Sequence, residues 1–239
     1  MLARLYEASW RDDVNLIVLD EMNIARVEHY FADLLSLLEL PDPDEWKLTL
    51  LSEPAANDPA HLINGKLTVP RNIRFIGTAN RDESTHTISD KVYDRAITLS
   101  LNTRGIPFDA PDAPPMPIAY RDLEVKFTNA CAEHPVSERL LADMESLDIY
   151  LTEHFAISCG NRIMKHLSVF VPVFVACGGE ALDAVDHLLM SKVLRKLDAL
   201  DLTLRHAELD ALVDYLNRLF GVGRMHTCLA YLEQRRLRG

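Results

Sequence analysis

The sequence predicts an α/β part followed by an all-α part, and two kinds of pattern support this division. Two short apolar runs, residues 16–19 (LIVL) and 73–76 (IRFI), each lead into polar residues, as expected for strands of a buried parallel sheet. After a proline-rich stretch the pattern becomes almost entirely helical. We therefore expect a parallel-sheet α/β core over residues 1–102, a linker over 103–119 and a helical domain over 120–239.

Local signals place further elements in the first part. Apolar side chains recur at helical spacing from Val27 to Leu38, which predicts one amphipathic helix that prolines 41 and 43 bring to an end. Asn64-Gly65 is a strong turn signal and predicts a small hairpin. The strand segments expected around it are 46–51, 61–63 and 66–69.

The boundary between the two parts lies in residues 102–119, which carry five prolines and one glycine. Proline at that density is incompatible with a helix or a central strand, so we expect an extended, semi-rigid linker. Helical segments are predicted beyond it at 120–133, 137–155, 161–176, 179–197, 207–220 and 223–236.

The acidic pair Asp20-Glu21 directly follows the first apolar run. Ligands of open α/β sheets bind just beyond the carboxyl ends of the strands, and two carboxylates at that position suit a Mg²⁺-nucleotide site. The first can hold the metal, directly or through water, and the second can polarise a water molecule. This is the form of a Walker B motif, although a strand that ends in a solvated acidic turn gives the same pattern.

A second segment, residues 72–101, supplies another strand with a polar end. The run 73–76 leads into GTAN, which ends at Asn80, and a polar loop and a short helix follow. That helix ends at Arg95, just before a third apolar stretch at 96–101 that we expect to be a strand. One strand thus ends in an acid pair, the next in an amide, and a lone arginine precedes the third.

With these two segments the chain resembles an AAA+ NTPase of the McrB/dynein-related branch. LDEMNIARVEHYFADLLSLLE is similar to that branch's Walker B segment, and IGTANRDESTHTISDKVYDRA to its sensor 1 strand and arginine-finger helix. The resemblance implies that Asp20 is the Mg²⁺-side carboxylate and Glu21 the water-polarising base. It also implies that Asn80 is sensor 1 and that Arg95 is an arginine finger, which acts on the nucleotide of a neighbouring subunit.

Two further residues enter the site by the same resemblance. Asn23 matches a polar position after the acid pair, and we expect it, like Asp20, to bind the cofactor. Arg26 matches another such position, and no role is assigned to it. Arg162 opens a predicted helix of the helical part, which in an AAA+ protein is the lid, and it resembles a sensor 2 arginine that reaches a γ-phosphate. An ordinary surface or inter-helix arginine is the alternative for Arg162.

The chain departs from that family in one large respect, because it contains no G-x-x-x-x-G-K-[ST] sequence. The family places this phosphate-cradling loop on a strand before the Walker B strand, in the middle of the sheet. The chain therefore resembles the C-terminal part of an AAA+ module. A truncated reading frame, a misassigned start and half of a split motor all agree with this pattern.

The implied function is Mg²⁺-dependent binding and hydrolysis of ATP or GTP in a ring, as in the motor of a McrB-like restriction system. Without a P-loop, the chain alone is expected to be inactive. The implied partners are further copies in a homo-oligomeric ring or a P-loop-bearing subunit, with a nuclease subunit and DNA reached indirectly. The alternative is a non-catalytic interaction subunit, or a remnant, that lends Arg95 to a P-loop-bearing partner.

The composition argues against several classes of protein. The 239 residues carry a net charge of −11, with a pI near 5.2, which argues against a general nucleic-acid-binding surface. The four cysteines lie far apart without a C-x-x-C pair, so we expect reduced thiols. No apolar stretch is long enough to span a bilayer, and the expected location is the cytoplasm, without membrane contact.

Overall fold

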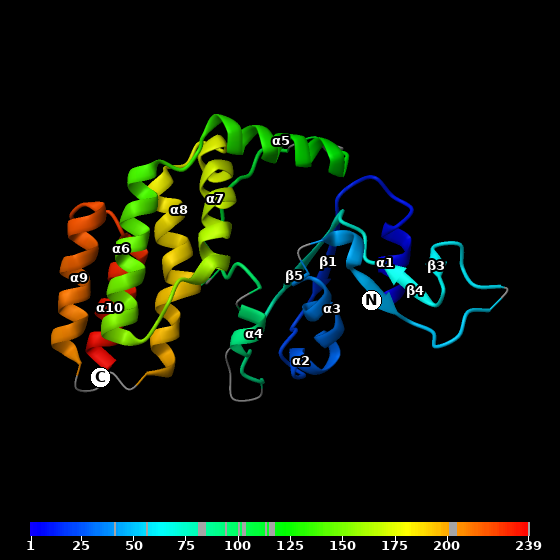
Figure 1. Ribbon diagram of the computed structural model, residues 1–239, viewed down its shortest axis with the longest axis horizontal. Helices are drawn as coiled ribbons and strands as arrows, with labels where there is room; N and C mark the ends of the chain where they lie inside the picture. Colours follow the sequence, from blue (N-terminus) through cyan, green and yellow to red (C-terminus); the bar gives the residue numbers. More distant parts are fainter. Residues whose placement is uncertain are drawn as a thin grey trace. The chain divides into compact units, whose positions relative to one another are not determined.

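The computed structural model describes residues 1–40, 42–55, 57–80, 85–93, 95–99, 101, 104–112, 114, 118–200 and 205–238. The chain divides into two compact units, Met1–Glu124 and Val125–Gly239, which are described separately (Figure 1). The first unit is α/β with a parallel strand pair, and the second is helical. Helix α5, Tyr120–Glu133, crosses the boundary between the units.

The parallel pair of the first unit consists of β1, Asn15–Leu19, and β5, Ile73–Gly77. The register pairs Asn15 with Ile73 and Leu19 with Gly77, so both strands end at the same edge. The two apolar runs predicted to be strands are confirmed, together with their parallel pairing. This pairing joins segments more than 50 residues apart, which the intervening helices and hairpin allow.

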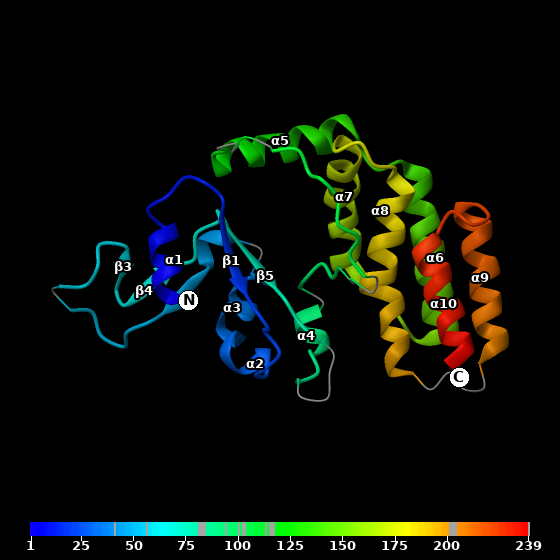
Figure 2. The same cartoon turned by 180° about the vertical axis from the view of Figure 1, so that it is seen from behind.

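Side chains alternate across the β1–β5 pair, and helices cover one of its faces. The remaining helices of this unit are α1 (Leu2–Ala8), α2 (Val27–Tyr30), α3 (Ala32–Leu37) and α4 (Asp90–Tyr93), with a 3₁₀ turn at Pro43–Glu45. Val27, Phe31 and Leu34 pack with Ile73 in the buried cluster of the first unit, and Figures 1 and 2 show α2 and α3 against the strand pair.

The other face of the pair is open among the described residues. Leu16 and Val18 are 60% and 59% exposed, and Ile76 is 46% exposed. The predicted third strand is wrong, since residues 96–99 and 101 have no strand conformation, and Leu99 is 77% exposed. A strand needs a neighbour for its backbone groups, and the described residues provide none beside this segment.

A second, antiparallel sheet confirms the predicted hairpin. Its order is β2 (Lys47–Thr49), β4 (Lys66–Thr68) and β3 (Leu62–Ile63). Asn64 and Gly65 have φ values of 52° and 72°, the left-handed conformation that a two-residue hairpin turn requires at both positions. The helix predicted from Val27 to Leu38 is broken at Phe31, where φ is −116° and ψ is 5°.

The second unit is built from α6 (Glu138–Phe155), α7 (Gly160–Ala176), α8 (Ala181–Leu188), α9 (His206–Phe220) and α10 (His226–Arg238). These helices run side by side in both views (Figures 1 and 2) and enclose a continuous apolar core. After α8 the chain continues as a π-helical turn, Leu189–Val193, and a 3₁₀ stretch, Leu194–Ala199, where we predicted one regular helix.

Side chains satisfy backbone N–H groups at the first turns of two helices in this unit. The Ser137 hydroxyl accepts a hydrogen bond from the Leu140 backbone N–H at 3.2 Å and caps α6. Buried Asp186 accepts the backbone N–H groups of Thr227 and Cys228 at 2.7 and 2.8 Å, in the first turn of α10. A carboxylate there satisfies orphan donors and complements the helix dipole. Among the described residues, no helix combines the length and apolar character needed to cross a membrane.

Candidate functional site

The carboxyl edge of the β1–β5 pair brings Asp20 and Thr78 together. Because Leu19 lies opposite Gly77, the next residue of each strand leaves the sheet at the same place. The Thr78 hydroxyl donates to Asp20 Oδ1 at 2.6 Å and accepts the backbone N–H of Glu21 at 2.7 Å. One hydroxyl thus fixes both the predicted metal-side carboxylate and the backbone of the predicted base.

Backbone hydrogen bonds tie the same two loops further. Thr78 N–H donates to the Leu19 carbonyl at 3.0 Å, and Met22 N–H donates to the Thr78 carbonyl at 2.8 Å. A Cβ atom at Gly77 would lie 2.1 Å from the sulfur of Met22, so glycine leaves room for the Met22 side chain to lie close to the end of β5. The loop that carries the acid pair is therefore anchored on β5.

Glu21 itself has a left-handed backbone with φ of 48°. A residue with a Cβ pays about 1–2 kcal/mol for this conformation, and such conformations concentrate at functional sites, where the surroundings enforce them. The hydrogen bonds from both sides of Glu21 supply that enforcement here. The Glu21 side chain is exposed.

Asn23 connects the acid-pair loop to the loop after β5. Its side chain is only 4% exposed, and its Nδ2 group donates to the carbonyl oxygens of Asn80 at 2.8 Å and His86 at 3.2 Å. The His86 N–H returns a bond to the Asn23 carbonyl at 2.8 Å. Asn23 Oδ1 is buried and has no hydrogen-bond partner within the described part of the chain. In this structure Asn23 is a clamp between two loops, and its contact with a cofactor stays a prediction.

Asn80, the predicted sensor 1, lies on the loop that Asn23 holds. Its carbonyl oxygen accepts from Asn23 and from the Thr85 hydroxyl, the latter at 2.9 Å. The residue is exposed. The acid pair and Asn80 therefore occupy two adjoining loops at one edge of the sheet, as the sequence predicts for residues that follow neighbouring parallel strands.

Arg95, the predicted arginine finger, is engaged within its own chain. Its guanidinium group forms an ion pair with Glu39, after α3, and donates to the Lys91 carbonyl in α4. The side chain is 20% exposed. Action on a neighbouring subunit would require this ion pair to open.

Arg162 is an exposed residue in the first turn of α7, in the second unit. Its role as a sensor of the γ-phosphate stays a prediction.

The donor set for a metal ion at the sheet edge is small. Among the residues that the structure describes, no group of three or more His, Cys, Asp or Glu side chains could hold a metal. Mg²⁺ bound to a nucleotide needs only one or two carboxylates, because phosphate oxygens and waters complete its shell. Asp20, oriented by Thr78, fits that requirement, and it is the carboxylate that would hold the ion.

Sequence reasoning assigned no role to Thr78, although a signal was present. A hydroxyl residue directly follows the second strand, at the position that the register sets beside Asp20. Only the pairing of the two strands turns this into a contact.

No protein-family model, curated protein or solved structure matches this chain. The family resemblance therefore rests on the motif residues alone.

Proposed function

We propose that this chain carries the hydrolytic part of an AAA+ nucleotide site of the McrB/dynein-related type, acting on ATP or GTP with Mg²⁺. The observation that supports it best is the hydrogen bond from Thr78 to Asp20 at the carboxyl edge of two parallel strands. That edge is where α/β sheets bind ligands. Asn80, near the start of the loop after β5, and Glu21, in its strained conformation, complete the arrangement.

Each residue has a definite task in this proposal. Asp20, held by Thr78, would hold Mg²⁺, and the ion would neutralise charge on the phosphate groups. Glu21 accepts a hydrogen bond from the attacking water and Asn80 helps to orient it. Arg95 leaves Glu39 and stabilises developing charge at the site of the adjoining subunit. Fingers of this kind contribute about 10³-fold or more to the rate.

A phosphate-cradling loop must come from another segment or subunit, since the sequence contains none. Such loops supply backbone N–H groups and a lysine. The exposed apolar face of the strand pair at Leu16, Val18 and Ile76 supports a partner that completes the sheet and its cover, because parallel sheets are normally covered on both faces. In the proposed assembly the partner's P-loop strand lies beside these strands.

The first experiment measures the chain alone. Mg²⁺-dependent binding of ATP or GTP in calorimetry is expected to be weaker than about 1 mM, or about −4 kcal/mol, with no steady phosphate release. Micromolar Mg²⁺-dependent affinity or turnover would contradict the assignment of the phosphate cradle to a partner.

The second experiment uses the chain co-purified with a P-loop-bearing subunit, such as the product of an adjacent reading frame. Glu21→Gln is expected to keep nucleotide binding and abolish turnover, whereas the matched change at the exposed Glu53, Glu53→Gln, is expected to keep both binding and turnover. Arg95→Ala is expected to lower turnover about 10³-fold. Mixing these two inactive variants should restore some activity, because a mixed interface can pair an intact Glu21 with an intact Arg95. Mixed assemblies without any restored activity would rule out action of Arg95 in trans.

A second candidate is a non-catalytic subunit that only lends Arg95 to a P-loop-bearing partner. The lack of a P-loop sequence in the chain agrees with this candidate as well as with the first one. The variants Glu21→Gln and Arg95→Ala distinguish the two candidates. If the partner holds a complete site, Glu21→Gln leaves turnover unchanged while Arg95→Ala abolishes it. Either candidate could couple nucleotide turnover to a nuclease or to DNA, and the reconstituted assembly would test this coupling.

A further inference from the structure

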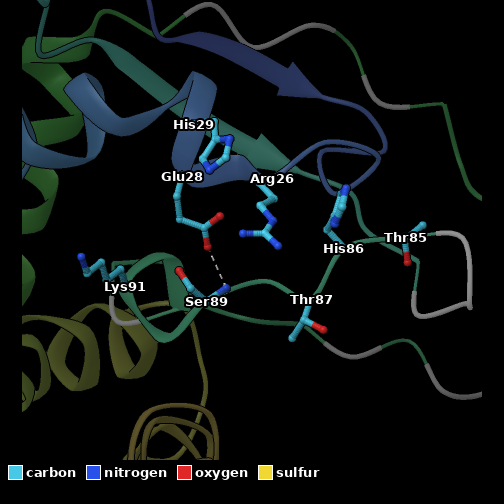
Figure 3. A pocket seen from close by; sticks show the side chains of 8 residues that line it. All are labelled: Arg26, Glu28, His29, Thr85, His86, Thr87, Ser89 and Lys91. Carbon is cyan, nitrogen blue, oxygen red and sulfur yellow. Dashed lines mark hydrogen bonds between the residues drawn. The ribbon is translucent and has the colours of Figure 1, made fainter.

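A cleft of about 710 Å³ in the first unit lies between α2 and the segment 85–91. Figure 3 shows the side chains that line it, with the Arg26 guanidinium between α2 and the segment Thr87–Ser89. Asp20 and Glu21 are not among its lining residues. The nitrogen-bearing side chains of the cleft are Arg26, His29, His86 and Lys91.

The strongest cations of this cleft, Arg26 and Lys91, form no ion pair with any residue that the structure describes. This contrasts with Arg95, which lies close by in sequence and is paired with Glu39. In a chain of net charge −11, two cations in one hollow with no described carboxylate in ion-pair distance favour an anionic ligand.

The one carboxylate that lines the cleft among the described residues is already engaged. Glu28 Oε1 accepts the backbone N–H of Ser89 at 3.0 Å (Figure 3). Hydrogen bonding from Ser89 lowers the pKa of the Glu28 carboxyl, so the group stays ionised and bonded at neutral pH. Glu28 therefore holds the segment 85–91 against α2 instead of neutralising Arg26.

The remaining lining selects for oxygen-rich anions. The exposed Thr87 hydroxyl adds a donor, whereas the Thr85 hydroxyl already donates to the Asn80 carbonyl oxygen and the Ser89 hydroxyl oxygen is buried. No aliphatic, Phe, Tyr or Trp side chain lines the cleft among the described residues. Phosphate oxygens match the guanidinium, ammonium and hydroxyl donors of this lining.

We propose that this cleft binds the phosphate oxygens of a polyphosphate or a phosphodiester, with Arg26 as the principal contact. The inference is separate from the proposed nucleotide site, because it uses neither the acid pair nor Mg²⁺. Free polyphosphates and a nucleic-acid backbone both carry this chemistry.

The test is calorimetric titration of the full chain in EDTA at low salt, with inorganic tripolyphosphate and, separately, with an oligothymidylate. We expect dissociation constants on the order of 0.1–1 mM that weaken as salt is raised. Arg26→Gln should weaken binding about tenfold, equivalent to about 1.4 kcal/mol, and Lys91→Gln should weaken it less. The ligand with the lower dissociation constant identifies the source of the phosphate.

A matched variant makes the outcome decisive. Arg4→Gln removes one positive charge from the same unit at a residue that does not line the cleft, and it should bind both ligands as the unmodified chain does. Tryptophan fluorescence melts check that each variant is folded. Absence of binding for both ligands, or equal loss in Arg26→Gln and Arg4→Gln, would overturn the proposal.

Discussion

Replacing Asn23 with aspartate tests the clamp between the acid-pair loop and the loop after β5. The change keeps the size of the side chain but replaces the Nδ2 donor by an acceptor. That acceptor would face the carbonyl oxygens of Asn80 and His86, now 2.8 and 3.2 Å from Nδ2. Because the site is 4% exposed, water cannot compensate freely. Two hydrogen bonds are lost and a charge is buried among acceptors, so we expect a cost of about 3–5 kcal/mol at pH 7.

The pH dependence of the loss has a definite sign. Burial and the facing carbonyl oxygens raise the pKa of the introduced carboxyl group in the folded state. Its protonated form can donate one hydrogen bond. The destabilisation is therefore largest above that raised pKa and declines as the pH falls toward about 4.

Tryptophan fluorescence provides a selective assay, because both tryptophans, Trp10 and Trp46, lie in the first unit. Urea unfolding of Asn23→Asp would be compared at pH 7 and pH 5 with Asn64→Asp, the same change at an exposed hairpin turn. If Asn23→Asp loses no more stability than Asn64→Asp, the amide does not clamp the loops.

Two further predictions follow from the backbone and the thiols. Glu21→Gly should raise the free energy of unfolding by about 0.5–1 kcal/mol, because glycine relieves the left-handed strain at φ 48° and this gain exceeds the extra entropy of glycine in the unfolded chain. Glu21→Ala keeps a Cβ and should give no such gain in urea unfolding. Equal effects of the two variants would show that the Glu21 backbone is not strained. Burial raises the pKa of the Cys159 thiol to about 12 and raises the pKa of the Cys228 thiol well above its ordinary value. A thiol-specific reagent at pH 8 should therefore modify the exposed Cys177 first. Cys159 and Cys228 should stay unmodified until the chain unfolds. Modification of all three at one rate would show that the core is open.

The sequence predicted which residues belong to the candidate site, but not the side-chain contacts that hold them. Apolar runs followed by an acid pair and an amide located Asp20, Glu21 and Asn80, and the parallel pairing then placed them on adjoining loops. The contacts of Thr78 and Asn23 could not be predicted, because each joins residues 57 or more positions apart. Such contacts depend on strand register, which no local pattern specifies.

The sequence by itself determined the elements whose signals are local: the strands β1 and β5, the Asn64-Gly65 hairpin, and the helix ends at Ser137 and Gly221. Backbone propensity and side-chain periodicity act within a few residues, so they can be read along the chain. Only the tertiary structure decided where α2 and α3 separate, that Arg95 pairs with Glu39, and that residues 96–99 stay outside the sheet. Those outcomes depend on which neighbours are present to satisfy a charge or a strand edge, and that is a property of the assembled fold.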